Sequence, residues 1–175
     1  HQKSKISVWG IGTKLVTAFD NPSLGAVYKL SALKDERGRW VKKLKLSEQK
    51  IKINNPGIHQ VRRFVRNSKF LGDMIYDINN TTTSHIMIDP DDSTKSKRFA
   101  HNKIEYEDLL KSIFKNGKLV YKSSPIHKIR NKLINDLNCL DKTHKRLENP
   151  HNYAVGLEKV LFEEKNNMII QLRKS

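Results

Sequence analysis

Hydrophobic and polar residues alternate in two runs of the first half of the chain, at residues 27–33 and 40–46. A period of two places successive side chains on opposite faces, as in a half-buried β-strand. The polar segment 34–39 separates the two runs, and its Gly38 can adopt the positive φ that hairpin loops often require. The pattern predicts a β-hairpin.

A second antiparallel pair is expected at residues 59–66 and 70–78, joined through residues 67–69. A strong turn signal, Asn-Asn-Pro-Gly at residues 54–57, precedes this pair. Pro presets φ at one central position of a turn, and Gly tolerates the reversed φ at the next. The two hairpins should therefore be separated by a tight turn.

The rest of the N-terminal and middle regions is less regular. Polar and turn-forming residues dominate residues 81–101, so we expect mostly loop there, with one strand at 85–88. Near the start of the chain a short β-prone run at residues 6–9 leads directly to Gly10 and Gly12. The simplest interpretation of this segment is a strand, a glycine loop and a helical turn.

The last third of the chain changes to a period of about three and a half, which is typical of amphipathic helices. Ser124 as N-cap and Pro125 at the first helical position predict a helix that ends at residues 149–150. A short helix is expected at residues 109–113, before an Asn-Gly turn at 116–117 and a brief strand. The apolar stripes of the two long helices, which we interpret as faces packed on the core, comprise Ile126, Ile129, Leu133, Leu137 and Leu140, then Leu157, Leu161, Met168 and Leu172.

Together these elements predict an α+β fold in which antiparallel β-hairpins are followed by C-terminal helices. Hydrophobic residues make up 37% of the 175 residues, which is enough for one core. No internal repeat or low-complexity linker divides the chain. No apolar run approaches the length of a membrane span, and no signal-type stretch follows the N-terminus, so we expect a cytoplasmic protein without a membrane partner.

The charge balance raises an alternative function. The chain has 34 Lys and Arg against 18 Asp and Glu, a formal net charge of +16, which attracts phosphate-rich partners. A small basic nucleic-acid-binding module is therefore an alternative interpretation. The basic residues are dispersed in short clusters with few aromatic residues among them, as on a solvated surface. Nucleic acid is thus not the expected partner.

One local motif suggests a ligand, the segment Gly10-Ile11-Gly12-Thr13-Lys14. Glycines let backbone N–H groups converge on one point without interference from Cβ, and a Thr hydroxyl and a Lys ammonium can add contacts to an anion. A phosphate would suit this segment. An ordinary tight turn is the alternative, and the spacing matches neither the P-loop nor the dinucleotide-binding pattern.

The sequence offers no other candidate chemistry. The seven His residues form no His-x-x-x-His pair, and Cys139 is the single cysteine, so neither a metal site nor a disulfide is expected. The adjacent carboxylates at residues 91–92 and 163–164 are interpreted as solvated. No catalytic residue is assigned within the chain.

Several motifs occur in the order in which they are found in bacterial nicotinate phosphoribosyltransferases. The chain resembles this family over nearly its whole length, most weakly at residues 79–101. The motifs that carry the resemblance are SVWGIGTKLVT at 7–17, DNPSLGAVYKL at 20–30, SE at 47–48, PGIHQVRR at 56–63, IFKNGKLVY at 113–121 and KRLENP at 145–150.

The resemblance implies that residues 1–175 are the C-terminal fragment of an irregular α/β-barrel phosphoribosyltransferase. Residues 1–30 would form the end of the barrel with a phosphate loop, residues 31–100 antiparallel strands and a loop, and residues 101–175 a helical C-terminal region. Residues 25–26, Gly-Ala, depart from the Gly-Gly of the family. The phosphate ligands implied by the resemblance are Gly10, Ile11, Gly12, Thr13 and Lys29; for Lys29, a lysine on a strand surface is the alternative.

The resemblance also implies an activity for the intact enzyme. Such an enzyme condenses nicotinate with phosphoribosyl pyrophosphate to nicotinate mononucleotide in NAD synthesis, coupled to ATP hydrolysis and with Mg²⁺ on the phosphates. The activating histidine, the nicotinate-clamping residues and the ribose-binding acidic motif of the family lie ahead of this sequence. We therefore expect the chain alone to be inactive, to hold no cofactor or metal, and to self-associate, with a homodimer as the intact form.

Overall fold

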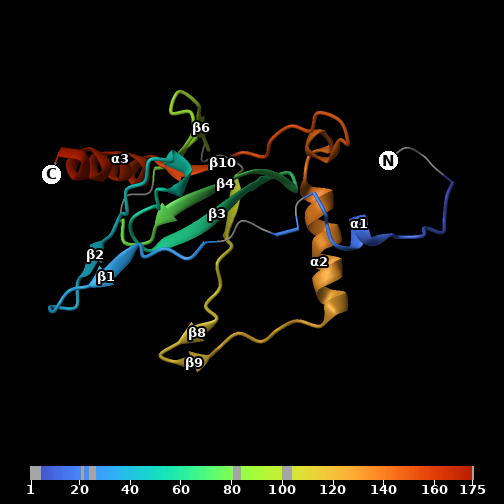
Figure 1. Cartoon of the computed structure of the whole chain (residues 1–175), viewed down its shortest axis with the longest axis horizontal. Helices are drawn as coiled ribbons and strands as arrows, with labels where there is room; N and C mark the ends of the chain where they lie inside the picture. Colours follow the sequence, from blue (N-terminus) through green and yellow to red (C-terminus); the bar gives the residue numbers. More distant parts are fainter. Residues whose placement is uncertain (1–4, 21, 24–26, 81–83, 100–103, 175) are drawn as a thin grey trace.

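The structure is a computed structural model that describes residues 5–20, 22–23, 27–80, 84–99 and 104–174. Most of its elements are strands, and a few helices precede and follow them (Figure 1). In chain order they are α1 (Thr13–Val16), β1 (Ala32–Lys34), β2 (Trp40–Lys42), the 3₁₀ turn η1 (Lys50–Lys52), β3 (His59–Arg66), β4 (Lys69–Asp77), β5 (Ile86–Ile88), β6 (Ser96–Arg98), β7 (Glu105–Asp108), β8 (Phe114–Lys115), β9 (Lys118–Leu119), α2 (Ile126–Cys139), the 3₁₀ turn η2 (Lys142–Lys145), β10 (Val155–Glu158) and α3 (Lys159–Lys174).

A six-stranded sheet in the order β6-β5-β10-β4-β3-β7 forms the centre of the molecule. All neighbouring strands run antiparallel except β10 and β4, which are parallel. The β3–β4 hairpin turns through Asn67 and Ser68, both with positive φ of 51° and 57°. Turns with two positive φ values match the twist of the flanking strands, which explains the tight connection.

The hydrophobic core lies against this sheet and is small. Phe64, Met74, Met87 and Phe99 form its buried cluster, and the rings of Phe64 and Phe99 stack with centroids 3.8 Å apart. α3 covers the sheet at β10 and β5, and its Leu161 is fully buried. Burial of these apolar side chains supplies the main stabilisation of the fold.

The carboxylate of Glu158 connects β10 to α3. It is 1% exposed and accepts hydrogen bonds from the N–H groups of Val160 and Leu161, at 2.9 and 3.1 Å, which are among the first amides of the helix. It also accepts from the N–H and the hydroxyl of Ser84. A carboxylate at a helix N-terminus satisfies otherwise unpaired donors and interacts favourably with the helix dipole. The buried charge is therefore fully engaged.

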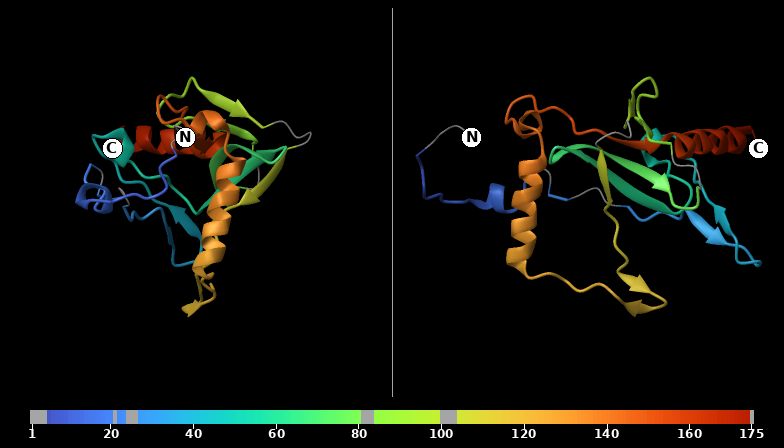
Figure 2. Two further views of the ribbon diagram at one scale, coloured as in Figure 1. Left: turned by 90° about the vertical axis from the view of Figure 1, so that its right-hand side faces the viewer. Right: turned by 180° about the vertical axis from the view of Figure 1, so that it is seen from behind.

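Several segments extend away from the sheet. The N-terminal segment with α1, the β8–β9 hairpin and most of α2 lie outside the core in both orientations (Figures 1 and 2). No described residue of α1 or α2 is buried. Among the described helices, none has the length and apolar character that a membrane crossing requires.

The α+β fold and the hairpins predicted from the pattern are confirmed. β1 pairs antiparallel with β2 around Gly38, whose φ is +76°, and β3 pairs antiparallel with β4. The strand predicted at residues 85–88 is present as β5. The Asn-Gly turn at residues 116–117 joins β8 to β9 with positive φ at both positions.

Three predictions for the N-terminal segment and the last third are wrong. Residues 6–9 form no regular strand, because no neighbouring strand pairs with them in the described part of the chain. Residues 109–113 are not helical and follow β7, which pairs with β3. Leu157 lies in a strand, β10, because long-range pairing with β4 and β5 determines its conformation.

The first long helix also differs from the prediction at both ends. Pro125, not Ser124, is the N-cap of α2, and no side chain caps it. The helix ends at Cys139 because the carboxylate of Asp141 accepts the N–H and hydroxyl of Thr143 and starts a separate 3₁₀ turn. The apolar stripe of α2 is exposed to solvent, so its interpretation as a core face is wrong for the residues described here.

Candidate functional site

The candidate phosphate loop lies at the N-terminus of α1. Gly12 is the N-cap residue, with extended φ and ψ of −93° and 175°, and its carbonyl accepts from the N–H groups of Leu15 and Val16 at 3.2 and 3.1 Å. α1 is a single turn, and Thr17 closes it by donating both its N–H and its hydroxyl to the carbonyl of Thr13. The glycines thus lead directly into a helix start.

The backbone N–H groups of the loop donate to no acceptor in the described part of the chain. Within the described ranges, no hydrogen bond has the N–H of Gly10, Ile11, Gly12 or Thr13 as its donor, nor the Thr13 hydroxyl as a participant. Of these four residues, Gly12 and Thr13 lie at the N-terminus of α1, where unpaired N–H groups can bind an anion, and Gly10 and Ile11 precede it. A Cβ added at Gly10 or Gly12 would meet nothing within 4 Å, so the loop is open to solvent. It offers donors to an anion, and the described chain does not enclose it.

Lys14 contacts two residues that follow the helical turn. Its ammonium lies 3.8 Å from the carboxylate of Asp20 and 5.7 Å from the ring centre of Phe19. All three residues are exposed and line a shallow hollow behind the helix turn. The ammonium of Lys14 is therefore engaged with the residues that follow the loop.

Lys29 is held in another part of the molecule. Its ammonium donates to the carbonyl of Lys52, and no described contact joins it to the glycine loop. Burial lowers the pKa of Lys165, and the positive charges of Lys50 and Lys29 lower it further. The structure thus brings Lys29 close to two other lysines. Residues 25–26, the Gly-Ala pair, lie outside the described residues.

The residues of the PGIHQVRR motif mostly pair with the rest of the protein. Gln60 exchanges hydrogen bonds with the backbone of Leu110, donating at 3.2 Å and accepting at 2.8 Å. Arg62 binds Asp108 and donates to the hydroxyl of Tyr76 at 2.9 Å. These contacts join β3 to β4 and to the end of β7.

The next arginine of the motif makes a similar contact. Arg63 forms a two-pronged ion pair with Asp73, at 2.9 and 2.7 Å, and Tyr153 donates to the same carboxylate. Hydrogen bonding to Asp73 raises the pKa of Arg63, and burial and the neighbouring Asp73 raise the pKa of Tyr153. Two-pronged pairs of this kind fix geometry as well as charge. The arginines of this motif therefore stabilise the sheet.

No metal site is formed by the described part of the chain. No group of three or more His, Cys, Asp or Glu side chains there has a geometry that could hold an ion. Cys139 is a free, half-buried thiol at the end of α2.

The comparisons with known proteins decide the family. Residues 58–165 match the family described as "Nicotinate phosphoribosyltransferase C-terminal domain". The chain belongs to this family. The matched region runs from the start of β3 into α3 and contains the central sheet, and the glycine loop lies ahead of it.

Relatives and a solved structure agree with this family. The chain is 34% identical to the nicotinate phosphoribosyltransferase of Bacillus subtilis, over 98% of this chain and 36% of that protein. It is 28% identical to the enzyme of Dictyostelium discoideum, over 95% of this chain and 29% of that protein. The chain thus spans about a third of the length of these curated relatives.

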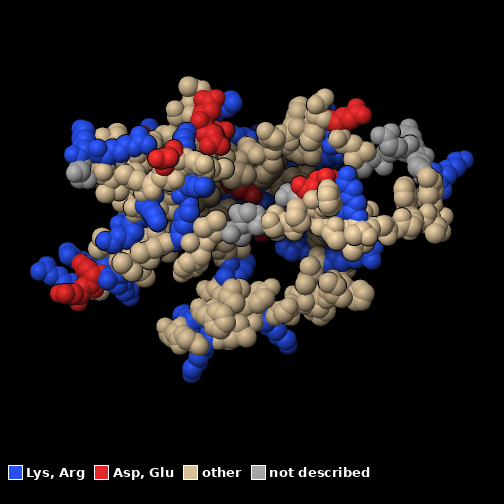
Figure 3. All heavy atoms as spheres, in the orientation of Figure 1, with Lys and Arg blue, Asp and Glu red and all other residues tan. Residues whose placement is uncertain are grey.

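The structural likeness concerns the fold. The crystal structure of human nicotinic acid phosphoribosyltransferase superposes with a TM-score of 0.56 at 20% identity, over 66% of this chain and 24% of that one. The alternative of a nucleic-acid-binding module is not favoured. Lys and Arg side chains are spread over several elements on the face that Figure 3 presents, and Asp and Glu lie among them.

Sequence reasoning missed the grouping of Lys29 with Lys50 and Lys165. Lys50 lies in a 3₁₀ turn and Lys165 on a helix near the other end of the chain, so no local spacing relates them. An indirect signal was present, since Lys165 follows Phe162 on α3 by three positions and shares its helix face. A lysine beside the apolar side of a helix is placed to be partly buried.

Proposed function

We propose that the intact protein containing this chain is a transferase that condenses nicotinate with phosphoribosyl pyrophosphate to nicotinate mononucleotide, in NAD biosynthesis. The match of residues 58–165 to the C-terminal domain family is the observation that carries the proposal. Two relatives that are similar over nearly the whole chain are named nicotinate phosphoribosyltransferase, and their names support the proposal.

Within this enzyme, the chain contributes a phosphate grip at Gly10, Ile11, Gly12 and Thr13. The support for this role is that four successive backbone N–H groups at a helix start have no internal acceptor in the described chain. Backbone N–H groups that converge on a phosphate stabilise the negative charge that develops on it. Lys29 would add a positive charge only if its contact with the Lys52 carbonyl were exchanged for one with phosphate.

The other parts of the proposal concern the intact enzyme. ATP and Mg²⁺ take part in its reaction, with Mg²⁺ carried by the phosphates of the substrates. The chain alone is inactive and holds no cofactor. The intact enzyme acts in the cytoplasm as a homodimer.

The phosphate grip is tested by removing one N–H at a position that accepts proline. Thr13 is the first residue of α1, where Pro is compatible with a helix, and Gly12 before it is already extended. Thr13→Pro removes both an N–H and a hydroxyl, whereas Thr13→Ser keeps both. Titration of Thr13→Ser with phosphoribosyl pyrophosphate should shift the amide NMR signals of Gly10, Ile11 and Gly12. Thr13→Pro should bind phosphoribosyl pyrophosphate at least about tenfold more weakly.

Two outcomes of this titration count against the grip. One is that the two variants bind phosphoribosyl pyrophosphate equally. The other is that the shifts occur only elsewhere in the chain, with the amides of residues 10–13 unchanged. Circular dichroism of both variants provides the control that the fold is retained.

A further inference from the structure

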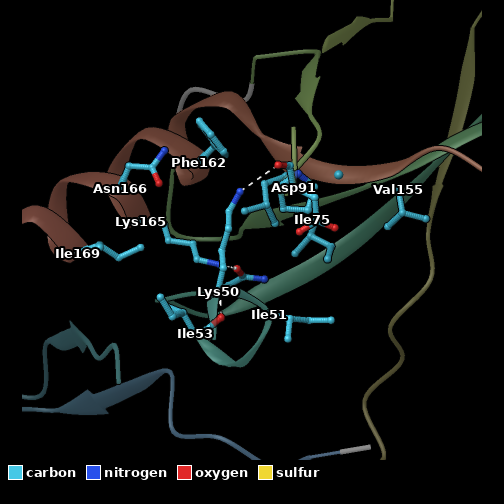
Figure 4. A pocket seen from close by; sticks show the side chains of 14 residues that line it. Lys50, Ile51, Ile53, Ile75, Asp91, Val155, Phe162, Lys165, Asn166 and Ile169 are labelled. Carbon is cyan, nitrogen blue, oxygen red and sulfur yellow. Dashed lines mark hydrogen bonds between the residues drawn. The ribbon is translucent and has the colours of Figure 1, made fainter. Parts of the chain in front are cut away.

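A cavity of about 220 Å³ lies between η1, the sheet and α3. Figure 4 shows Lys50, Ile51 and Ile53 along one side, and Phe162, Lys165, Asn166 and Ile169 of α3 along the other. Ile75 of β4 and Val155 of β10 close its inner wall. Two lysines, the carboxylate-bearing Asp91 and an apolar wall therefore line one space.

The lysines of this cavity form no ion pair with a carboxylate of the residues that the structure describes. Lys165 donates to the side-chain oxygen of Asn55 at 2.9 Å and to the carbonyl of Ile53 at 3.4 Å, and Lys50 donates to the carbonyl of Asp91 at 3.1 Å. No salt bridge among the described residues includes Lys50, Lys165 or Lys29. An ammonium has three donors, so the cavity retains unused ones.

The electrostatics of the cavity favour an anion. Burial lowers the pKa of Lys165, the positive charges of Lys50 and Lys29 lower it further, and the charge of Asp91, which also lines the cavity, raises it. Positive groups in a partly buried site repel one another, and an anion between them removes that cost. Two lysines against one carboxylate, Asp91, leave the cavity with an excess of positive charge.

The apolar wall indicates what kind of anion fits. Ile53, Ile75, Val155 and Phe162 offer only carbon atoms to a ligand, so a fully hydrated anion such as inorganic phosphate would lose solvation against them. Ligand sites for drug-sized molecules measure roughly 300–1,000 Å³, and this cavity is smaller. A small molecule with one charged end and one apolar end matches both features.

We propose that this cavity binds a small organic carboxylate, with Lys165 and Lys50 on the carboxylate and the isoleucines and Phe162 around its apolar body. None of its lining residues belongs to the glycine loop, so the proposal is independent of phosphate binding there. The cavity connects η1 with α3, and an occupant would tie the two segments together.

The test is a titration of the chain with benzoate, observed through the methyl NMR signals of Ile53, Ile75 and Ile169. Benzamide has the same shape without the charge, and inorganic phosphate has charge without the apolar body. We expect saturable shifts with benzoate, and at least about tenfold weaker binding of both comparison probes, because a charge-assisted hydrogen bond is lost with one and the apolar contact with the other.

Variants of the two lysines make the test specific. Lys165→Gln and Lys50→Gln should each weaken benzoate binding at least about tenfold, and Lys165→Arg should retain part of it. Lys159→Gln, on the same helix but in an exposed pair with Glu163 at 3.7 Å, is the matched control and should bind like the parent chain. Thr13→Pro should also leave benzoate binding unchanged, which separates this site from the phosphate loop.

Three results would overturn the proposal. These are equal binding of benzoate and benzamide, equal binding of benzoate and phosphate at the isoleucine methyls, or unchanged benzoate binding in Lys165→Gln. Thermal unfolding shows whether a variant still folds, and Lys165→Gln should be no less stable than the parent because a partly buried charge is removed. If it is nevertheless unfolded, Lys50→Gln decides the question in the same titration.

Discussion

At the scale of single residues, Gly57 is fixed by two constraints. Its φ is +106°, a conformation that side chains with a Cβ rarely adopt. A Cβ at this position would lie 2.3 Å from a carboxylate oxygen of Asp77. The Asp77 side chain is fully buried, and the same oxygen lies 2.9 Å from the ammonium of Lys42. The glycine of the turn therefore makes room for a partly buried ion pair that connects β2 to β4.

Gly57→Ala should destabilise the protein more than Gly38→Ala. At Gly38, φ is +76° and nothing lies within 4 Å of an added Cβ, so alanine there meets only the backbone cost of about 1–2 kcal/mol. At Gly57 the displacement of Asp77 adds to this cost, giving about 2–4 kcal/mol in all. Urea unfolding of both variants measures the difference, and equal losses would show that Asp77 does not constrain this position.

A second prediction at this scale concerns pH. The hydrogen bonds from Arg62 lower the pKa of Asp108 below its usual value near 3.9. Because the folded-state pKa is lowered, this carboxylate stabilises the fold above about pH 4, and the contribution is lost as the pH falls through the folded-state pKa. The stability difference between the parent and Asp108→Asn should therefore be larger at pH 6 than at pH 3 in urea unfolding.

The exposed pair of Lys132 and Asp136 on α2 supplies the control for this measurement. Asp136→Asn should change stability little at either pH, because exposed ion pairs contribute little. A stability difference for Asp108→Asn that stays constant from pH 6 to pH 3 would contradict the assignment of this contact.

At the scale of elements, the two long helices contribute differently to stability. Leu133 of α2 is 57% exposed, whereas Leu161 of α3 is fully buried. Leu161→Ala should cost about 2–5 kcal/mol, since it leaves a cavity in the packed region, and Leu133→Ala should cost less than about 1 kcal/mol. Chemical unfolding of the two variants tests this contrast, and a larger loss for Leu133→Ala would show that α2 packs on the core.

The elements also show how far local pattern determines this fold. The hairpins at Gly38 and at Asn67-Ser68 were predictable, because alternation and turn chemistry lie within a few neighbouring residues. β10 was not, because Leu157 takes its conformation from strands far away in the sequence. The same limit applies to the cavity between η1, the sheet and α3, because its two lysines, Lys50 and Lys165, are far apart in the sequence.

The glycine loop lies between these cases. The motif at residues 10–13 predicted a glycine loop before a helical turn, and the structure has this turn as α1. Phosphate binding by the loop stays a prediction. The strand expected ahead of it is absent, since a strand needs a neighbour to pair with. Lys29 could not be placed from sequence because its acceptor, the Lys52 carbonyl, is a backbone group in another segment.

At the scale of the whole molecule, the chain consists of a small packed sheet region and exposed segments around it. Ile126, Ile129 and Leu133 of α2, together with Val8 and Trp9 near the N-terminus, are at least half exposed. The chain spans about a third of the length of its curated relatives. The phosphate grip that we propose for this chain is accordingly one of several parts of the active site of the intact enzyme.

The most direct test of the central claim is a chimeric enzyme. In the Bacillus subtilis relative, the stretch that aligns with this chain is replaced by the chain, and nicotinate mononucleotide formed from nicotinate, phosphoribosyl pyrophosphate and ATP is measured. We predict an active chimera, at least about a hundredfold lower activity with Thr13→Pro, activity retained with Thr13→Ser, and no product from the chain alone. A folded chimera without activity, or one that Thr13→Pro leaves unchanged, would contradict the account.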